Sequence, residues 1–518
     1  MKKIPIFISD FAQMIQEDYL YVDKTQHLYQ LVKEKGYYFL SRPRRFGKSL
    51  LVSTLKQLFL GNKYLFEKLW IDSSHYQWQE YPVIHLDFSI IDHESADALR
   101  SNLAWKLKQI AQDYGINISE APSLSAMLEM LVVELSKKKN KVIILIDEYD
   151  KPILDHLTVI ENAKMQRDVL RSFYADIKGL DAYLYFVLLT GVSKFSKTSI
   201  FSGLNNLNDI SMKPEAAALL GYTEDELKKY FAGYIDIIAQ ERETSKQVIM
   251  QEMKVWYDGY RFSRQKTLVY NPFSVLYYLK DKELSNYWFE SGTPSFLIEL
   301  LKKEYDVLDD IDQIEWSSET LGTFDIDYIH LVIVLFQTGY LTIADYDKYT
   351  RKYILNYPNQ ETRDSFQKYV LAALVNSNFQ SIERGISQLR NALKNNDVHQ
   401  FCIILQSIFA HIPYHLHIAQ ERYYHSLFQL MGNLIGMDMQ SEIATDKGRI
   451  DLVITTKTHI YIFELKFKKD ADTALAQIQT QKYYERYVLQ KKKEIVLVGL
   501  SFNHDNNKLS VECVSQPL

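Results

Sequence analysis

The sequence predicts an α/β protein with a doubly wound parallel sheet first, a helical and winged-helix-like region next, and a second α/β domain last. Three observations predict this fold class. Apolar runs of strand length alternate with amphipathic helical segments, a Gly-Lys-Ser loop follows the first run, and two adjacent carboxylates end a later run. We expect the domains to span residues 1–220, 221–408 and 409–518.

Composition sets outer limits on function. The chain has 518 residues, 47% of them hydrophobic and 24% charged, which is typical of a folded protein with more than one core. A net charge of −5 excludes a basic nucleic-acid coat. The start lacks the apolar run of a signal peptide, and the longest apolar runs are too short for a membrane span. Two cysteines, Cys402 and Cys513, are too few for a disulfide framework, so we expect a cytoplasmic protein and no membrane.

The Gly47-Lys48-Ser49 loop predicts a phosphate-binding site. It lies between an apolar run at residues 37–40 and a helical pattern at 49–60, so the free N–H groups of the helix face an anion. Lys48 would bind phosphate oxygens and the Ser49 hydroxyl would bind Mg²⁺. Arg42 stands where such loops have their first glycine, and Arg45 is one of three arginines beside the site. We therefore expect a P-loop NTPase sheet with an unusual loop.

Two carboxylates, Asp147 and Glu148, follow the apolar run at residues 142–146. Ligands bind at the carboxyl ends of strands in such sheets, so Asp147 is expected to support the metal and Glu148 to polarise water. Thr190 ends another run and is expected beside the terminal phosphate, although it could equally cap a loop. For an arginine finger, Arg171 and Lys194 are only guesses.

The periodicity also predicts the order of elements in the first domain. Strands are expected at residues 37–40, 83–88, 142–146, 183–190 and 210–212, and helices at 49–60, 96–114, 124–135 and 166–178. In the middle region, the pattern predicts a helix at 325–337, a hairpin from 340–344 and 353–357, and a further helix. A helix followed by a hairpin suggests a winged helix, and its charge favours packing or lid duty over nucleic-acid binding.

The C-terminal segment predicts a second site. Helix 421–431, strands 440–444, 448–455 and 460–466, helix 471–489 and strand 494–500 are expected. Glu464 and Lys466 share one face of a strand, and a hairpin brings Asp451 beside them. Two carboxylates suit Mg²⁺ or Mn²⁺, and the lysine can orient water. Such motifs often occur by chance in surface salt bridges, but burying charge beside the run 461–463 is costly without a role. Glu421 and Glu442 are weaker metal-ligand candidates.

Several motifs together resemble the bacterial AAA-ATPase-like family, whose members commonly carry a C-terminal nuclease domain of the PD-(D/E)xK superfamily. The motifs are Tyr21-Val-Asp-Lys-Thr25, Arg42-Pro-Arg-Arg-Phe-Gly-Lys-Ser49, Leu145-Ile-Asp-Glu-Tyr-Asp-Lys-Pro152, Leu189-Thr-Gly-Val-Ser-Lys194, Trp256-Tyr-Asp-Gly-Tyr-Arg-Phe262, Tyr270-Asn-Pro-Phe-Ser274 and Tyr287-Trp-Phe-Glu-Ser-Gly-Thr-Pro294. The resemblance implies that the arginine-rich loop is functional. It also implies a restriction-endonuclease-like C-terminal domain, in which Gln477, Lys482 and Tyr483 on the following helix complete the motif.

These observations predict an ATP-binding and ATP-hydrolysing protein fused to a Mg²⁺-dependent nuclease, with DNA favoured over RNA as its partner. The alternative is an ATP-controlled switch or scaffold whose C-terminal domain binds nucleic acid without cutting it. A third interpretation, in which both sites have decayed, is disfavoured because all the key residues are present together. A homo-oligomer is left open.

Overall fold

The computed structural model divides the chain into two compact units, which are described separately here. Unit 1 comprises residues 1–297 and 311–363, and unit 2 comprises 298–310 and 364–518. The structure describes residues 1–195, 200, 204, 206–289, 297, 300–301, 304, 313–321, 326–375, 378–410, 421–445, 448–489, 493–505 and 508–518. The division does not coincide with the boundaries expected after residues 220 and 408. Residues 290–294 of the last motif above and residue 325 lie outside the described residues. The predicted helix 325–337 begins only at Leu331, because residues 326–330 are not helical.

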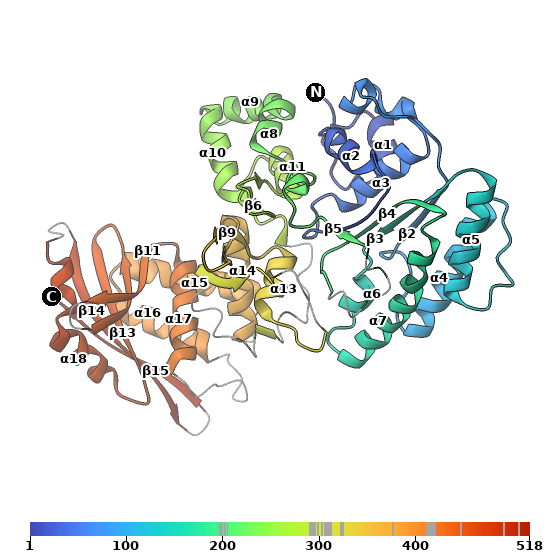
Figure 1. The fold of residues 1–518 in the computed structure, drawn as a ribbon. Helices are drawn as coiled ribbons and strands as arrows, with labels where there is room; N and C mark the ends of the chain where they lie inside the picture. Colours follow the sequence, from blue (N-terminus) through green and yellow to red (C-terminus); the bar gives the residue numbers. More distant parts are fainter. Residues whose placement is uncertain are drawn as a thin grey trace. The chain divides into compact units, whose positions relative to one another are not determined.

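A parallel sheet forms the centre of the first part of unit 1 (Figure 1). Its strand order is β2-β3-β4-β1-β5. The strands are β1 (Gly36–Ser41), β2 (Val83–Asp87), β3 (Val142–Asp147), β4 (Leu184–Gly191) and β5 (Asn208–Asp209). Because β3 and β4 pair in parallel with β1 and β2 at their sides, the carboxyl ends of all these strands lie at one edge of the sheet.

Helices cover both faces of this sheet, as expected for a doubly wound fold (Figure 1). On one face α3 packs against the sheet and α1 packs on α3, while α4, α5 and α7 form a layer on the other. The helices of this part are α1 (Phe11–Gln16), α2 (Thr25–Val32), α3 (Lys48–Phe59), α4 (Ala96–Asp113), α5 (Leu124–Lys138), α6 (Lys151–Leu154) and α7 (Ile160–Ala175). Short 3-10 turns are η1 (Lys63–Phe66), η2 (Trp70–Ser73), η3 (Asp176–Leu180) and η4 (Pro214–Ala216).

Two predicted element positions in this part are wrong. The last strand is Asn208–Asp209 rather than 210–212, because Ile210 ends the pairing and Ser211 turns back to bond Asp209 and Ser41. The last helix begins at Ile160 rather than 166 and gives way at residue 176 to a 3-10 turn. The first turns of α7 are rich in exposed polar residues, and these weaken the apolar periodicity on which the predicted start depends.

The rest of unit 1 contains a small helical group and a helix–hairpin group. The helical group has its own apolar core and consists of α8 (Glu224–Tyr230), α9 (Ala232–Glu241), α10 (Lys246–Tyr257), β6 (Tyr260–Arg261), β7 (Leu268–Val269) and α11 (Pro272–Asp281). Helix α8 starts at an acidic segment, and Thr223 and Glu226 form a capping box there.

The helix–hairpin group agrees with the predicted winged-helix-like arrangement. Helix α13 (Leu331–Thr338) ends at Gly339, which has a left-handed φ of 93°. Strands β9 (Thr342–Asp347) and β10 (Lys352–Asn356) form the hairpin. Helix α14 (Gln360–Leu374) follows and belongs to unit 2 from Asp364 on. A third strand, β8 (Ile314–Ser317), pairs with β10 and was not predicted, because its alternation is only four residues long.

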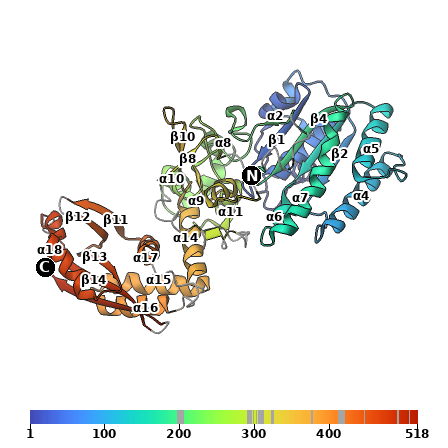
Figure 2. The ribbon, with the colours of Figure 1, turned by 60° about the horizontal axis from the view of Figure 1, so that its bottom comes forward.

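Unit 2 is built on a five-stranded mixed sheet of order β11-β12-β13-β14-β15. The strands are β11 (Asp438–Thr445), β12 (Gly448–Thr455), β13 (His459–Phe467), β14 (Glu494–Asp505) and β15 (Lys508–Pro517). Helix α18 (Ala471–Gln481) covers one face, and α15 (Phe379–Lys394), α16 (Val398–Phe409) and α17 (Glu421–Ile435) lie on the other (Figure 2). This is the restriction-endonuclease-like α/β domain that the sequence predicts.

Three features of unit 2 differ from the expectations. The helix predicted at 471–489 stops at Gln481, because Lys482 adopts a left-handed φ of 51°, and the 3-10 turn η9 (Tyr483–Tyr487) follows. Strand β15 was not predicted at all. A disulfide joins Cys402 of α16 to Cys513 of β15, with their Cα atoms 6.1 Å apart, so the two cysteines form one cross-link.

No helix in the described part of the chain is both long and apolar enough to cross a membrane.

Candidate functional site

The phosphate loop of unit 1 fixes the position of its lysine through its own backbone. Gly47 precedes α3 with a φ of 91°, a conformation that glycine adopts without strain. Lys48 is only 5% exposed, and its Nζ donates hydrogen bonds to the carbonyl oxygens of Arg42 (3.0 Å) and Pro43 (3.1 Å). Burial lowers the pKa of Lys48, and the nearby Glu148 carboxylate opposes that shift. The lysine is therefore held by the backbone oxygens of its own loop.

Arg42 occupies the position of the missing glycine, yet its side chain turns into the protein. Its guanidinium donates to the carbonyl oxygens of Ser41 (2.9 Å), Ser211 (2.6 Å) and Ala216 (2.8 Å) and lies 4.2 Å from the centre of the Phe262 ring. Burial lowers its pKa to about 9. Arg42 therefore anchors the start of the loop from behind.

A cavity of about 450 Å³ opens beside the loop. Gly47, Lys48, Ser49 and Glu148 line it, so the expected phosphate-side residues come together. Its lining also includes residues of the segment 5–9 before α1 and of α11, among them Phe7, Phe273 and Tyr277. Arg45, which has a φ of 67°, places its guanidinium 5.8 Å from the centre of the Phe7 ring and 5.1 Å from that of Phe273. The cavity thus combines cations with aromatic rings.

Asp147 and Thr190 are brought together but lie behind the lining residues. Thr190 Oγ1 donates to Asp147 Oδ1 at 2.5 Å, and the N–H of Glu148 donates to the same oxygen at 3.1 Å. Asp147 and Thr190 are buried and are not among the residues that line the cavity. Glu148 reaches the cavity through a left-handed φ of 51°, a strained conformation for a residue with a side chain. Thr190 therefore positions Asp147.

Asp150 is a further site residue that sequence reasoning missed. Its Oδ2 accepts hydrogen bonds from the backbone N–H groups of Val192 (2.9 Å) and Ser193 (2.6 Å), so the loop after β3 holds the loop after β4. Burial raises its pKa to about 6. Its position three residues after Asp147 was the only available signal.

The two arginine-finger guesses have different surroundings. Lys194 forms an ion pair with Asp209 at 2.5 Å, while Arg171 is exposed on α7. The ion pair ties Lys194 to β5 within its own chain.

The second site of unit 2 lies where β12 and β13 separate. Leu452 pairs with Phe463 and Val453 with Ile462, so the next position along the same register sets Asp451 beside Glu464. Asp451 Oδ2 accepts a hydrogen bond from the N–H of Leu465 at 2.7 Å.

The lysine of the motif is bound to one of the carboxylates. Lys466 Nζ lies 2.8 Å from Glu464 Oε1, and the two side chains are 13% and 2% exposed. Glu464 and Lys466 point to the α18 face of the sheet, since Ile460 and Ile462 of the same parity pack in that core. Asp451, Glu464 and Lys466 therefore share one corner of the domain.

Among the described side chains, no group of three or more His, Cys, Asp or Glu residues could hold a metal ion. The chemistry of Asp451 and Glu464, two carboxylates at one strand end, nevertheless suits a hard divalent cation. Glu442 stands opposite Asp451 on β11 by register, but the side chains of Glu442 and Glu421 lie outside the described residues.

The residues expected on the following helix are divided by its end. Gln477 lies in α18, where its Nε2 donates to Tyr483 Oη at 3.5 Å, and Lys482 terminates the helix. Tyr483 follows the helix and is buried in the apolar core that α18 covers. The predicted grouping of all three residues on one helix is therefore wrong.

Fold and sites together define a protein that joins a P-loop ATPase-type domain to a nuclease-type domain. Residues 5–201 match the family model of predicted AAA-ATPases, and residues 419–512 match a PD-(D/E)XK nuclease superfamily model. A protein described as the uncharacterized protein in the vnfD 5′ region of Azotobacter chroococcum mcd 1 is 36% identical over 521 residues, covering 98% of each chain. The chain belongs to this family of AAA-ATPase-like proteins with a C-terminal PD-(D/E)XK domain, and the resemblance inferred from its motifs is confirmed.

Solved structures show only distant likeness. The Orc1 protein of Aeropyrum pernix in complex with DNA is 12% identical, with 67% of this chain and 91% of that chain covered and a TM-score of 0.25. Cdc6p from Pyrobaculum aerophilum is 11% identical, with 67% and 92% covered and a TM-score of 0.23. Values this low support no conclusion about function.

Proposed function

We propose that unit 1 binds and hydrolyses ATP with Mg²⁺, and that the C-terminal domain cleaves nucleic acid phosphodiesters with a divalent cation. The observation that carries the first part is the 450 Å³ cavity, which unites Lys48, Ser49 and Glu148 at the carboxyl edge of a parallel sheet. The second part is supported by Asp451, Glu464 and Lys466 at one corner of a PD-(D/E)XK domain.

In the ATPase, Lys48 exchanges its two carbonyl partners for the β- and γ-phosphates. Ser49 and Asp147 would hold Mg²⁺, which neutralises charge on the phosphates. Thr190 fixes the Asp147 carboxylate by its hydrogen bond, and Glu148 polarises the attacking water. The Phe7, Phe273 and Tyr277 rings, with Arg45 beside them, supply an apolar and cationic lining for the base.

In the nuclease, Asp451 and Glu464 would hold Mg²⁺, or Mn²⁺ in its place, and the ion would lower the pKa of a bound water. Lys466 is close enough to Glu464 to orient that water or to stabilise charge on the phosphate. DNA is the preferred substrate in this proposal.

The ATPase is tested by nucleotide binding and turnover in the full chain. Lys48→Ala should abolish ATP binding, because it removes the buried cation from the loop. Glu148→Gln should keep binding and lower turnover by about a hundred- to a thousandfold, as expected for loss of a group that acts on the attacking water. Equal ATP affinity in wild type and Lys48→Ala would overturn the assignment.

The nuclease is tested with a panel of single- and double-stranded DNA and RNA, with Mg²⁺, Mn²⁺ or chelator, and with or without ATP. Asp451→Asn should remove both metal binding and cleavage. Cleavage that persists unchanged in chelator would refute a metal-dependent mechanism.

One observation favours a second function, an ATP-controlled switch that binds nucleic acid without cutting it. Lys466 already neutralises Glu464, and the described side chains contain no three-ligand metal cluster. If the wild-type protein binds DNA in an ATP-dependent way but releases no product with any divalent cation, this second function replaces the nuclease.

A further inference from the structure

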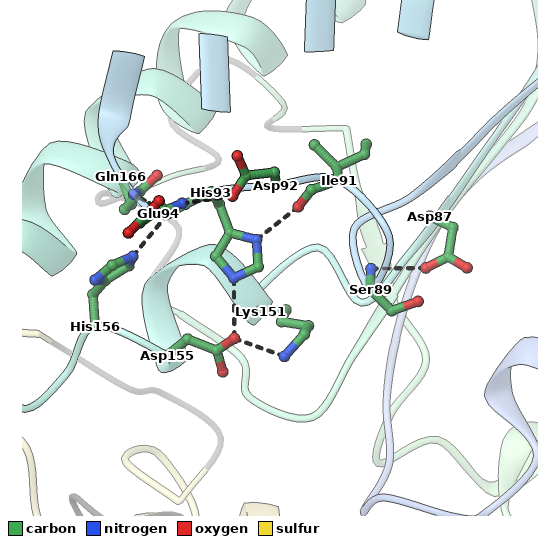
Figure 3. A network of polar contacts seen from close by, with 10 residues as sticks. All are labelled: Asp87, Ser89, Ile91, Asp92, His93, Glu94, Lys151, Asp155, His156 and Gln166. Carbon is green, nitrogen blue, oxygen red and sulfur yellow. Dashed lines mark hydrogen bonds and ion pairs between the residues drawn. The ribbon is translucent and has the colours of Figure 1, made fainter. Parts of the chain in front are cut away.

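Figure 3 shows a charge network of unit 1 that is not part of the mechanism above. His93, from the loop after β2, and Lys151, from the start of α6, converge on the carboxylate of Asp155 (Figure 3). His93 Nε2 lies 3.0 Å and Lys151 Nζ 2.6 Å from Asp155 Oδ2. Both cations therefore share one oxygen.

The loop that carries His93 is held firmly from the neighbouring helices. The His93 carbonyl oxygen accepts hydrogen bonds from His156 Nε2 and Gln166 Nε2, each at 2.8 Å. His93 Nδ1 lies 2.7 Å from the carbonyl oxygen of Ile91, so both ring nitrogens face acceptors. This geometry favours the doubly protonated ring, and the hydrogen bond to Asp155 raises the pKa of His93. Asp155 therefore keeps a cationic partner even if Lys151 leaves.

Lys151 differs from the other two members because it also lines the nucleotide cavity. It borders the same 450 Å³ space as Lys48, Ser49 and Glu148. Its side chain is 29% exposed and that of Asp155 is 36% exposed. Ion pairs at such exposure contribute little to stability, whereas a lysine bonded to a phosphate makes a strong charge-assisted contact. Transfer of Lys151 from Asp155 to a terminal phosphate is therefore favourable.

We propose that Lys151 is a ligand of the γ-phosphate, and that Asp155, backed by His93, competes with this phosphate for the lysine. The proposal rests on the ATP-binding function above and adds a residue that distinguishes ATP from ADP. Lys48 acts on phosphates from within the loop. The N–H of Lys151 donates to the carbonyl oxygen of Glu148 at 3.0 Å, and both side chains line the cavity, so Lys151 is assigned to the phosphate nearest the hydrolytic group.

The test is the ratio of ATP to ADP affinity, measured by calorimetry or fluorescent-nucleotide competition on the full chain. Lys151→Met should weaken ATP binding about tenfold or more and leave ADP binding within about twofold, because only ATP has the third phosphate. Lys151→Arg should restore part of the preference. Asp155→Asn should strengthen ATP binding severalfold, because it removes the carboxylate that competes with the phosphate for Lys151.

Lys228→Met is the matched control, since Lys228 and Glu224 form an i,i+4 pair at 2.7 Å on α8. This control should leave both affinities unchanged. If wild type binds ATP but Lys151→Met keeps the wild-type ATP-to-ADP ratio, the role of Lys151 is refuted while ATP binding stands. If wild type binds neither nucleotide, the proposed ATPase itself fails.

Discussion

The two candidate sites differ in what holds their charged groups. In unit 1, the backbone holds two of the central groups: Lys48 bonds to loop carbonyls, and Asp150 accepts from two N–H groups. In unit 2, Glu464 and Lys466 form an ion pair with each other, and Asp451 accepts a hydrogen bond from the N–H of Leu465. The ATP site is therefore assembled by the fold, whereas the second site is assembled partly by its own side chains.

This difference has a physical consequence. A group fixed by backbone contacts keeps its position when a neighbouring side chain is changed, so single substitutions should alter chemistry rather than geometry. A buried ion pair behaves otherwise, because removing one partner leaves the other charged and desolvated. Substitutions in unit 2 should therefore change both the function and the pKa values of neighbouring groups. Substitutions in unit 1 should change the function alone.

The largest expected effect is on cleavage by Glu464→Gln. The change keeps the size of the side chain but removes a metal-ligand charge and the ion pair with Lys466. We expect cleavage to fall by at least about a thousandfold. Steady-state ATP turnover by the same preparation is the control and should stay at the wild-type level. Wild-type cleavage by this variant would exclude Glu464 as a ligand.

Arg42→Gly restores the usual glycine of a phosphate loop and should still damage the protein. The substitution removes three hydrogen bonds to buried carbonyls and the contact with the Phe262 ring. We expect unit 1 to lose about 3 kcal/mol of unfolding free energy. Denaturant unfolding with ATP present and absent identifies the transition of unit 1. An unchanged midpoint for that transition, together with tighter ATP binding, would show that Arg42 does not stabilise unit 1 and that glycine serves the loop better.

A smaller effect is expected for Lys466→Met, which leaves both carboxylates in place. Metal binding should persist or strengthen, because the competing ammonium group is gone, while cleavage should fall by about a hundredfold. Isothermal titration with Mn²⁺, paired with a cleavage assay, separates the two quantities. Loss of metal binding together with cleavage would mean that the lysine only supports local structure.

The sequence predicted those parts of the fold that one short segment determines. The buried strand before Asp147 and the loop at Gly47-Lys48-Ser49 each carry their own signal, and both lie where expected at the carboxyl edge of the parallel sheet. The alternation 460–466 likewise gave strand β13. Local periodicity was sufficient in these cases because the packing environment is encoded residue by residue.

What could not be predicted depends on residues that are distant in sequence. Arg42 bonds to carbonyl oxygens about 170 positions away in the sequence. The loop motif alone therefore could not show that its side chain turns into the protein instead of lining the cavity. Thr190, in β4, contacts Asp147, in the neighbouring strand β3. Cys402 lies next to Cys513 only because β15 completes the sheet. The helix expected through residue 489 failed for another reason. A left-handed residue at Lys482 ended it, and lysine carries no such signal in the sequence.

The smallest expected effect tests whether the burial of one carboxyl group in unit 1 costs stability. Glu361, at the start of α14, is completely buried and accepts hydrogen bonds from Ser274 Oγ on α11 (3.0 and 2.7 Å) and from the N–H of Trp288 (2.7 Å). Burial raises the pKa of this carboxyl from 4.5 to about 8, although the hydrogen bonds act in the opposite direction.

The folded protein therefore binds this proton more tightly than the unfolded chain does. The resulting contribution to stability is complete below pH 4.5 and is lost as the pH rises through about 8. Glu361→Gln has no proton to lose, so its unfolding free energy should not show this decline. Between pH 5 and 6.5, in buffers at constant ionic strength, we expect the variant to gain on the order of 2 kcal/mol relative to wild type. Denaturant unfolding at several pH values measures the difference. Parallel pH profiles for the two proteins would show that Glu361 stays ionised in the folded state, and that α11, which carries Phe273 of the nucleotide cavity, is held without this cost.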